Sequence, residues 1–136
     1  MKNNLILIIL IFFFPSKVLA QDLFIQSKNI SLDKNREITV FEKEVVVRTK
    51  ENSKIISDYA EYDKKKSFIK FKDNVVVTDI KNNRIETNSA EYDDISKIFE
   101  SKGPTKIITT ENYTILAEDI IFNNKSNIIN SKKKTL

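Results

Sequence analysis

The stretch I-E-T-N-S-A-E-Y-D, residues 85–93, decides the fold because a similar stretch recurs every thirty residues. The other copies are I-Q-S-K-N-I-S-L-D at 25–33, I-I-S-D-Y-A-E-Y-D at 55–63 and I-L-A-E-D-I-I-F-N at 115–123. Every copy begins with Ile, has a small residue third, Ile or Ala sixth and Leu, Tyr or Phe eighth, and ends with Asp or Asn. A fixed period of this length is typical of a supersecondary unit that stacks on copies of itself. The sequence therefore predicts about four stacked repeats.

The first twenty residues have the features of a secretory signal peptide. Lys2 supplies a positive start, residues 5–14 form an unbroken apolar run, and residues 18–20 (V-L-A) fit a signal-peptidase site. The alternative is an uncleaved membrane anchor, but the run is shorter than the roughly 20 residues that span a bilayer. We therefore expect residues 1–20 to be a signal peptide and residues 21–136 to form one mature domain.

The charge and the absence of cysteine narrow the class of protein. The chain has 23 basic and 19 acidic residues, and the loss of Lys2 and Lys17 with the signal leaves a net charge of +2. Apart from the short clusters at 64–66 and 132–134, the charges are interspersed, which does not match the concentrated basic face of a nucleic-acid-binding protein. Because there is no cysteine, an exported chain must hold its fold without disulfides.

The mature chain reads as a succession of short strands. Its single glycine and single proline, Gly103 and Pro104, exclude a flexible linker, and the turns come from clusters of Asp, Asn and Lys. Runs rich in Val, Ile, Thr, Phe and Tyr lie between these clusters, with no helical periodicity. Each repeat is predicted to hold three strand-like pieces, of which residues 68–71, 75–78 and 85–92 are the example.

The strand pattern also predicts a bend. Ile85 and Thr87 share one face of a strand, but Ala90 and Tyr92 would then point to the other face. A bulge or bend near residues 88–89, and likewise near 58–59, brings both pairs to the same side. Without helical crossovers the strands pair antiparallel by default. The predicted fold is all-β: a curled antiparallel sandwich with an apolar inner side and a side rich in Lys, Glu and Asn.

The chemistry of most enzymes is missing. Histidine and cysteine are absent, and one glycine excludes both a phosphate-binding loop and a dinucleotide fingerprint. Carboxylate pairs such as Asp93 with Asp94 sit at turns, where solvated turn residues are the simpler interpretation than acid–base catalysis or calcium binding. The sequence predicts a protein that is not an enzyme and that has no metal site and no cofactor.

The alternation of F-K-D-N-V-V-V, residues 71–77, with the stretch at 85–93 resembles the OstA-like family. That repeat is shared by the lipopolysaccharide-transport protein LptA and the N-terminal periplasmic domain of LptD, and the resemblance covers residues 24–131. The family has a glycine in a phrase of the form f-x-G-n-V. Residues 72–74 and 42–44 replace this phrase without glycine, whereas the next copy has Gly103 close by. A bulge in the first two places must therefore form without glycine.

The resemblance implies an open β-jellyroll whose apolar groove shelters the acyl chains of lipopolysaccharide. It also implies a periplasmic location, association with the outer membrane, and partners in other jellyroll proteins of the transport bridge, which dock end to end by strand pairing. The candidate lipid-binding residues are Val45, Val47, Ile55, Tyr62, Phe68, Val75, Val77, Ile85, Tyr92, Ile107, Ile115 and Phe122. For each of them, ordinary core packing is the alternative. The alternatives for the whole chain are a β-rich envelope scaffold that binds no lipid and a truncated LptD fragment.

Overall fold

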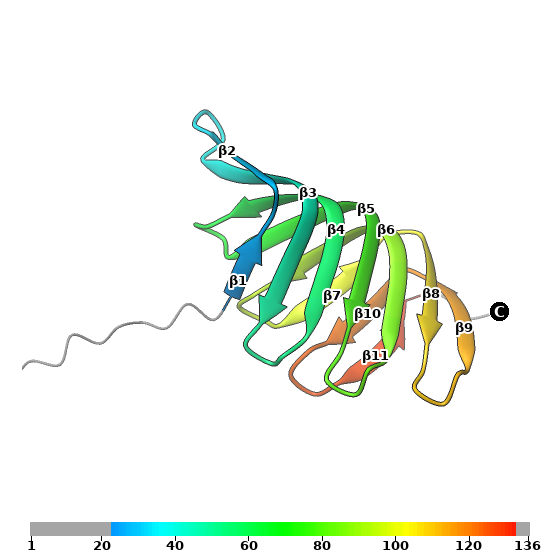
Figure 1. The fold of residues 1–136 in the computed structure, drawn as a ribbon. Coiled ribbons are helices and arrows are strands. Elements are labelled where there is room, and N and C mark those ends of the chain that lie inside the picture. The colour runs from blue at the N-terminus through cyan, green and yellow to red at the C-terminus, as the bar shows by residue number, and fades with distance from the viewer. Residues whose placement is uncertain (1–22, 133–136) are drawn as a thin grey trace, which may run out of the picture.

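The structure is a computed structural model that describes residues 23–132 (Figure 1). Its strands are β1 (Leu23–Gln26), β2 (Asn29–Asp33), β3 (Ile38–Thr49), β4 (Lys54–Asp63), β5 (Phe68–Thr78), β6 (Arg84–Asp93), β7 (Ile98–Ser101), β8 (Pro104–Ile108), β9 (Thr114–Glu118), β10 (Ile120–Asn123) and β11 (Ile128–Ser131). They form one antiparallel sheet, which confirms the predicted all-β class. The predicted signal peptide and residues 133–136 lie outside the described part of the chain. Within residues 23–132, no helix has the length and apolar character to cross a membrane.

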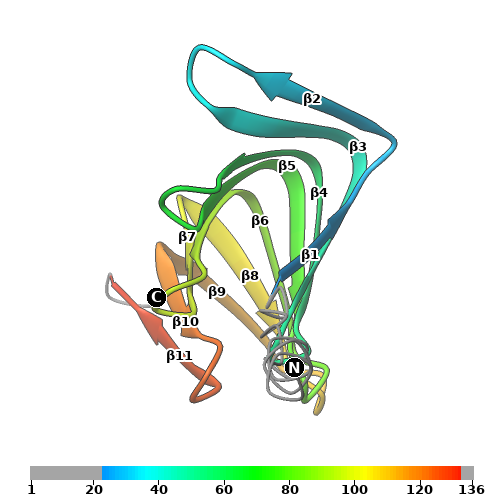
Figure 2. The same ribbon diagram turned by 90° about the vertical axis from the view of Figure 1, so that its left-hand side faces the viewer.

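The sheet bends over into two layers that face each other (Figure 2). The four long strands β3 to β6 each run through both layers. We call the front layer the part made of β1, residues 45–49, 54–57, 75–78 and 84–87, β8 and β9. The back layer is made of β2, residues 38–42, 59–63, 68–72 and 90–93, β7, β10 and β11. Two layers folded from one sheet are the predicted curled sandwich.

The Asp or Asn that ends each copy of the repeated stretch explains the turns of the back layer. A side-chain oxygen of Asp33, Asp63, Asp93 or Asn123 accepts hydrogen bonds from backbone N–H groups two or three residues later, at 2.9–3.1 Å. This is the side-chain turn that Asp and Asn favour. The four turns that follow, at residues 34–37, 64–67, 94–97 and 124–127, are spaced by thirty residues. The predicted repeat is therefore a repeat of strand and turn in three dimensions.

The strand pieces join differently from the prediction. Residues 68–71 and 75–78 were expected as separate strands, but both belong to β5, and the corresponding pieces of the preceding repeat both belong to β3. Only in the third occurrence of these two pieces do they separate, as β7 and β8. A bulge lets one strand change direction without ending, so each central repeat has two long strands instead of three short ones.

The predicted interruption of strand pairing is confirmed, and its structure is visible in the backbone. The register shifts between Ile56 and Tyr59 of β4, and between Lys72 and Val75 of β5. The left-handed residues lie on the strands next to the predicted positions: Lys43 (φ 63°) and Glu44 (52°) on β3, and Asp73 (64°) and Asn74 (51°) on β5. Gly103 (84°) takes this conformation in the next repeat. The glycine-free bulges expected from the sequence therefore form with ordinary L residues.

Candidate functional site

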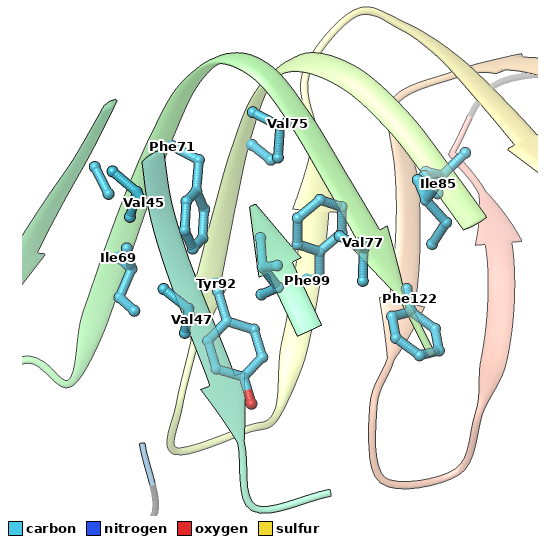
Figure 3. Packing of buried hydrophobic residues seen from close by; sticks show 14 of the residues in the cluster. Val45, Val47, Ile69, Phe71, Val75, Val77, Ile85, Tyr92, Phe99 and Phe122 are labelled. Carbon is cyan, nitrogen blue, oxygen red and sulfur yellow. The ribbon is translucent and has the colours of Figure 1, made fainter. Parts of the chain in front are cut away.

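The inward side chains of both layers form one continuous apolar cluster. Figure 3 shows Val75 and Val77 of the front layer facing Phe71, Tyr92 and Phe99 of the back layer. In β6, Ile85, Thr87, Ala90 and Tyr92 are all buried, as the predicted bend requires. The bend thus places residues from both halves of one strand on the two walls of the same interior.

Most predicted lipid-binding residues point into this interior. Those buried in the cluster are Val45, Val47, Ile55, Val75, Val77, Ile85, Tyr92, Ile107 and Phe122. Tyr62 is half-buried and packs against them. Since side chains fill the centre of the sandwich, these residues are core residues in the structure, and their contact with lipid stays a prediction.

Two of the predicted residues lie differently. Phe68 alternates with the buried Ile69 and Phe71, so it belongs to the opposite face of the back layer, and its predicted inward position is wrong. Ile115 pairs with the buried Ile107 and shares its face, but it is 41% exposed because β9 is an edge strand. The run F-I-K-F offers two apolar residues next to each other, and Phe68 was assigned to the wrong one of the two faces.

Sequence reasoning missed several inward residues of the back layer. Phe41, Ile69, Phe71, Phe99 and Ile120 are all buried in the cluster. The pairing of strands could have identified them. Ala90 and Tyr92 point inward, so the residues directly opposite them on the neighbouring strands also point inward. Tyr92 faces Ile69 and Phe99 in register, and Ala90 faces Phe71.

The interior is open at the N-terminal end of the sandwich. Ile30 and Leu32 of β2 pair with Phe41 and Thr39 of β3, so they continue the inward rows, yet each is 61% exposed. Figure 2 shows why: β2 and the first half of β3 diverge from β1 at this end. We call Ile30 and Leu32, with the partly buried Leu23 and Ile25 of β1, the N-terminal mouth.

A buried polar cluster joins the two layers along the edge opposite the bend. The hydroxyl of Ser53 donates to Oδ1 of Asn124 at 2.5 Å, and Nδ2 of Asn124 donates to Oγ1 of Thr49 at 2.9 Å. The turn after β3 is thereby tied to the turn after β10, more than seventy residues later. We call Thr49, Ser53 and Asn124 the clasp.

Two unpaired polar atoms lie in the interior of the described region. The hydroxyl of Tyr92 and Oε2 of Glu51 are buried and make no hydrogen bond. Burial of the phenol raises the pKa of Tyr92 well above its usual value, so the group stays protonated at neutral pH. The phenol is therefore a neutral donor that points toward the edge of the apolar interior (Figure 3).

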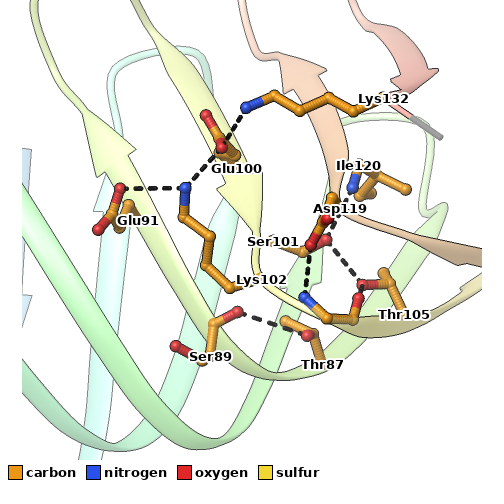
Figure 4. A network of polar contacts seen from close by, with 11 residues as sticks. Thr87, Ser89, Glu91, Glu100, Ser101, Lys102, Thr105, Asp119, Ile120 and Lys132 are labelled. Carbon is orange, nitrogen blue, oxygen red and sulfur yellow. Dashed lines mark hydrogen bonds and ion pairs between the residues drawn. The ribbon is translucent and has the colours of Figure 1, made fainter.

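Polar contacts hold the bend of the fourth repeat, where the strands are separate (Figure 4). The backbone N–H of Gly103 donates to Asp119 Oδ1 at 2.7 Å, and the N–H of Ile120 donates to Ser101 Oγ at 3.0 Å. Thr105 Oγ1 lies 2.7 Å from the same Ser101 oxygen. These contacts fix β8 and β9 to β7 and β10, so the C-terminal end of the interior keeps the two layers together.

A large hollow of the described molecule lies outside the space between the layers. It has a volume of about 1200 Å³ and lies on the outer side of the front layer, next to the bend. Val46, Ile56, Val76 and Leu116, which alternate with the buried inward residues, line it. We call this hollow the outer trough. Of the predicted lipid-binding residues, only Val45 and Val75 contribute to its wall.

Comparison with solved structures supports the fold. The chain is similar to LptH of Pseudomonas aeruginosa, described as the LptA-homologous periplasmic component of the lipopolysaccharide transport device. The TM-score is 0.67, the identity is 18%, and the match covers 84% of each chain. No curated protein matches the chain in sequence. The jellyroll expected from the resemblance is therefore the fold of this chain.

The family model that matches is not the one named from the repeat. Residues 20–135, nearly the whole chain, match the model described as "Lipopolysaccharide-assembly, LptC-related". The predicted connection to lipopolysaccharide transport is confirmed, while the family description names LptC where the repeat suggested LptA or LptD. The chain belongs to the LptC-related family of lipopolysaccharide-assembly proteins.

Proposed function

We propose that this protein shelters the acyl chains of lipopolysaccharide between its two layers during transport through the periplasm to the outer membrane. The observation that carries the proposal is the continuity of the inward apolar rows. They begin at the exposed Ile30 and Leu32, run through the buried core, and reach the exposed Ile115 at the other end. Apolar rows that are exposed at both ends suit a ligand that is moved along the protein.

Lipid entry in this proposal begins at the N-terminal mouth. Ile30 and Leu32 expose apolar surface that no element of the described part of the chain covers. Covering it with an acyl chain is favourable by about 25 cal/mol for each Å² buried. Deeper entry requires the layers to separate, because Val47, Ile55 and Phe122 fill the centre. The bend joins the layers along one side, so separation along the other side requires the hydrogen bonds of the clasp to break.

The edge strands support the proposed partners. Among the strands of residues 23–132, β1 and β2 pair only with β3, β9 pairs only with β8, and β11 pairs only with β10. An edge strand carries unpaired backbone groups that can bind a strand of another protein. We propose that other jellyroll proteins of the transport bridge add at these ends and extend the interior. The finer assignment to the N-terminal domain of LptD stays a prediction.

A second function has its own supporting observation. Val45, Val47, Tyr92 and Ile120 are fully buried and pack together in the centre of the sandwich. A β-rich envelope scaffold that pairs with partners and binds no lipid would have such a core. The two functions differ in whether the purified protein binds lipopolysaccharide.

Titration of the purified protein with lipopolysaccharide tests the proposal. Leu32→Glu places a charge in the N-terminal mouth without disturbing the filled core, and we expect at least tenfold weaker binding with unchanged unfolding. Leu116→Glu is the matched control, because Leu116 is 66% exposed but lies on the outer face of the front layer. We expect it to bind like the unmodified protein. No binding by the unmodified protein would favour the scaffold, and loss of binding in Leu116→Glu alone would place the lipid in the outer trough.

A further inference from the structure

The outer trough crosses six strands at right angles to their direction. Its lining takes residues from β3, β4, β5, β6, β8 and β9, which lie side by side across Figure 1. The floor is a registered cross-strand row whose members are, in order, Val46, Ile56, Val76, Glu86, Lys106 and Leu116. Its apolar residues lie toward the two ends, and Glu86 and Lys106 lie between them. With strands about 4.8 Å apart, five intervals give a length of about 24 Å.

Several of these strands have the sequence of strands covered on both faces, whereas β6 has the polar residues Arg84, Glu86 and Asn88 on its outer face. Three consecutive valines occur at 45–47 and again at 75–77, and apolar pairs occur at 55–56, 107–108 and 115–116. Continuous apolar runs are typical of strands buried on both sides, whereas a solvated outer face alternates with polar residues. Inward members of these runs fill the core, but within residues 23–132 no element of the chain covers the outward members. The pattern therefore indicates that something else covers the trough.

Opposite charges border the two long sides of the trough. Along the bend, Glu44, Asp58 and Glu118 form an acidic border. On the other side, Arg48 pairs in register with Lys54, and Arg84 lies two strands beyond, so this border is basic. A partner that fits this surface has apolar residues for the ends of the floor and charges complementary to the acidic and basic borders.

These charges are accessible to a partner. Glu44 and Lys28 form an ion pair at 2.7 Å, and Arg84 and Glu86 form one at 2.8 Å. The side chains of Glu44 and Arg84 remain 70% and 52% exposed. Exposed pairs of this kind contribute little to stability, so exchanging them for contacts with a partner has a low cost.

We propose that the outer trough binds an amphipathic α-helix of another protein, laid across the strands with its apolar stripe on Val46, Ile56 and Val76. A volume of about 1200 Å³ over about 24 Å gives a cross-section of about 50 Å². That is half the cross-section of an α-helix with a diameter of about 10–12 Å. The helix carries basic residues on the flank toward the bend and acidic residues on the flank toward Arg48 and Lys54. This interface is independent of the proposed lipid function.

Photo-crosslinking in the native cell tests the proposed helix. Benzoylphenylalanine replaces Val46 in one variant and Leu116 in another, at the two ends of the trough, and Lys70 on the outer face of the back layer in a control. Mass spectrometry then identifies the crosslinked peptide. Val46 and Leu116 should label one partner protein at sites about 16 residues apart, since an α-helix rises about 1.5 Å per residue. An extended partner would give a separation of about seven residues.

The outcomes decide the proposal in both directions. Support requires the helical spacing in a segment with an apolar stripe and opposite flanks, and at least a fivefold loss of crosslinking when Lys54→Glu and Arg84→Glu are combined. The control variant Lys70→Glu should crosslink as before. The proposal is overturned if the label falls only on lipid, on residues 1–22 of this chain or on a second copy, if the spacing is extended, or if no specific product forms. None of these results depends on whether lipopolysaccharide binds between the layers.

Discussion

At the scale of single residues, left-handed backbone is the feature that shapes this protein. Lys43 and Asp73 occupy equivalent places in successive repeats, and both have positive φ, whereas the next repeat has Gly103 there. The sequence predicted that the first two bulges form without glycine, but it could not show which residues take the left-handed conformation. Asp tolerates left-handed backbone through local hydrogen bonding, but Lys gains nothing from it. Of these three residues, Lys43 should therefore have the most strained backbone conformation.

We predict that Lys43→Gly stabilises the protein by about 0.5–1 kcal/mol. Relief of left-handed strain is worth about 1–2 kcal/mol for an ordinary L residue, and the greater freedom of glycine in the unfolded chain removes about 0.5–1 kcal/mol of that. Urea denaturation measures the free energy of unfolding. Asp73→Gly is the matched control and should change stability by less. A destabilised Lys43→Gly protein would show that the bulge carries no strain at this position.

At the scale of elements, the strands show what periodicity predicts and where it fails. The thirty-residue period, the antiparallel pairing and the bend beside Ser89 follow from the repeat columns. The repeat columns do not show whether residues 68–71 and 75–78 form one strand or two. Continuity of the strand depends on the backbone conformation of Asp73 and Asn74. The outward Val46 and Val76 were also missed, because only the first and third valine of each run were assigned to a face, although alternation places the middle valine on the opposite face. The clasp could not be predicted, because the sequence places Asn124 in a turn cluster and gives no sign that its side chain contacts another turn.

We predict that Asn124→Ala lowers the free energy of unfolding by about 1–3 kcal/mol. Removal of the amide leaves the buried hydroxyl of Ser53 without its acceptor and takes away a donor to Thr49, and an unpaired buried polar group costs about this much. Chemical denaturation measures the loss. Asn130→Ala, at an exposed position of β11, should be close to neutral. Equal effects of both substitutions would mean that the clasp does not hold the layers together.

At the scale of the whole molecule, the protein is one sheet folded so that both halves share an apolar interior. The inward positions were predicted to a large extent, because columns such as Val77, Ile85 and Tyr92 repeat through the chain, while their contact with lipid stays a prediction. The open N-terminal mouth was not predicted, since the exposure of Ile30 and Leu32 depends on how far β2 diverges from β1. The family match places the chain among the lipopolysaccharide-assembly proteins, and the similar solved structure supports the jellyroll fold.

The most direct test of a lipid path between the layers compares two neighbouring residues of β2. Leu32 continues the inward rows, whereas Ser31 points to the outer face of the back layer. With a photoreactive amino acid at each position in turn, in cells that make lipopolysaccharide, we predict a lipopolysaccharide adduct at residue 32 and none above background at residue 31. An adduct at residue 31 with none at residue 32 would contradict the account.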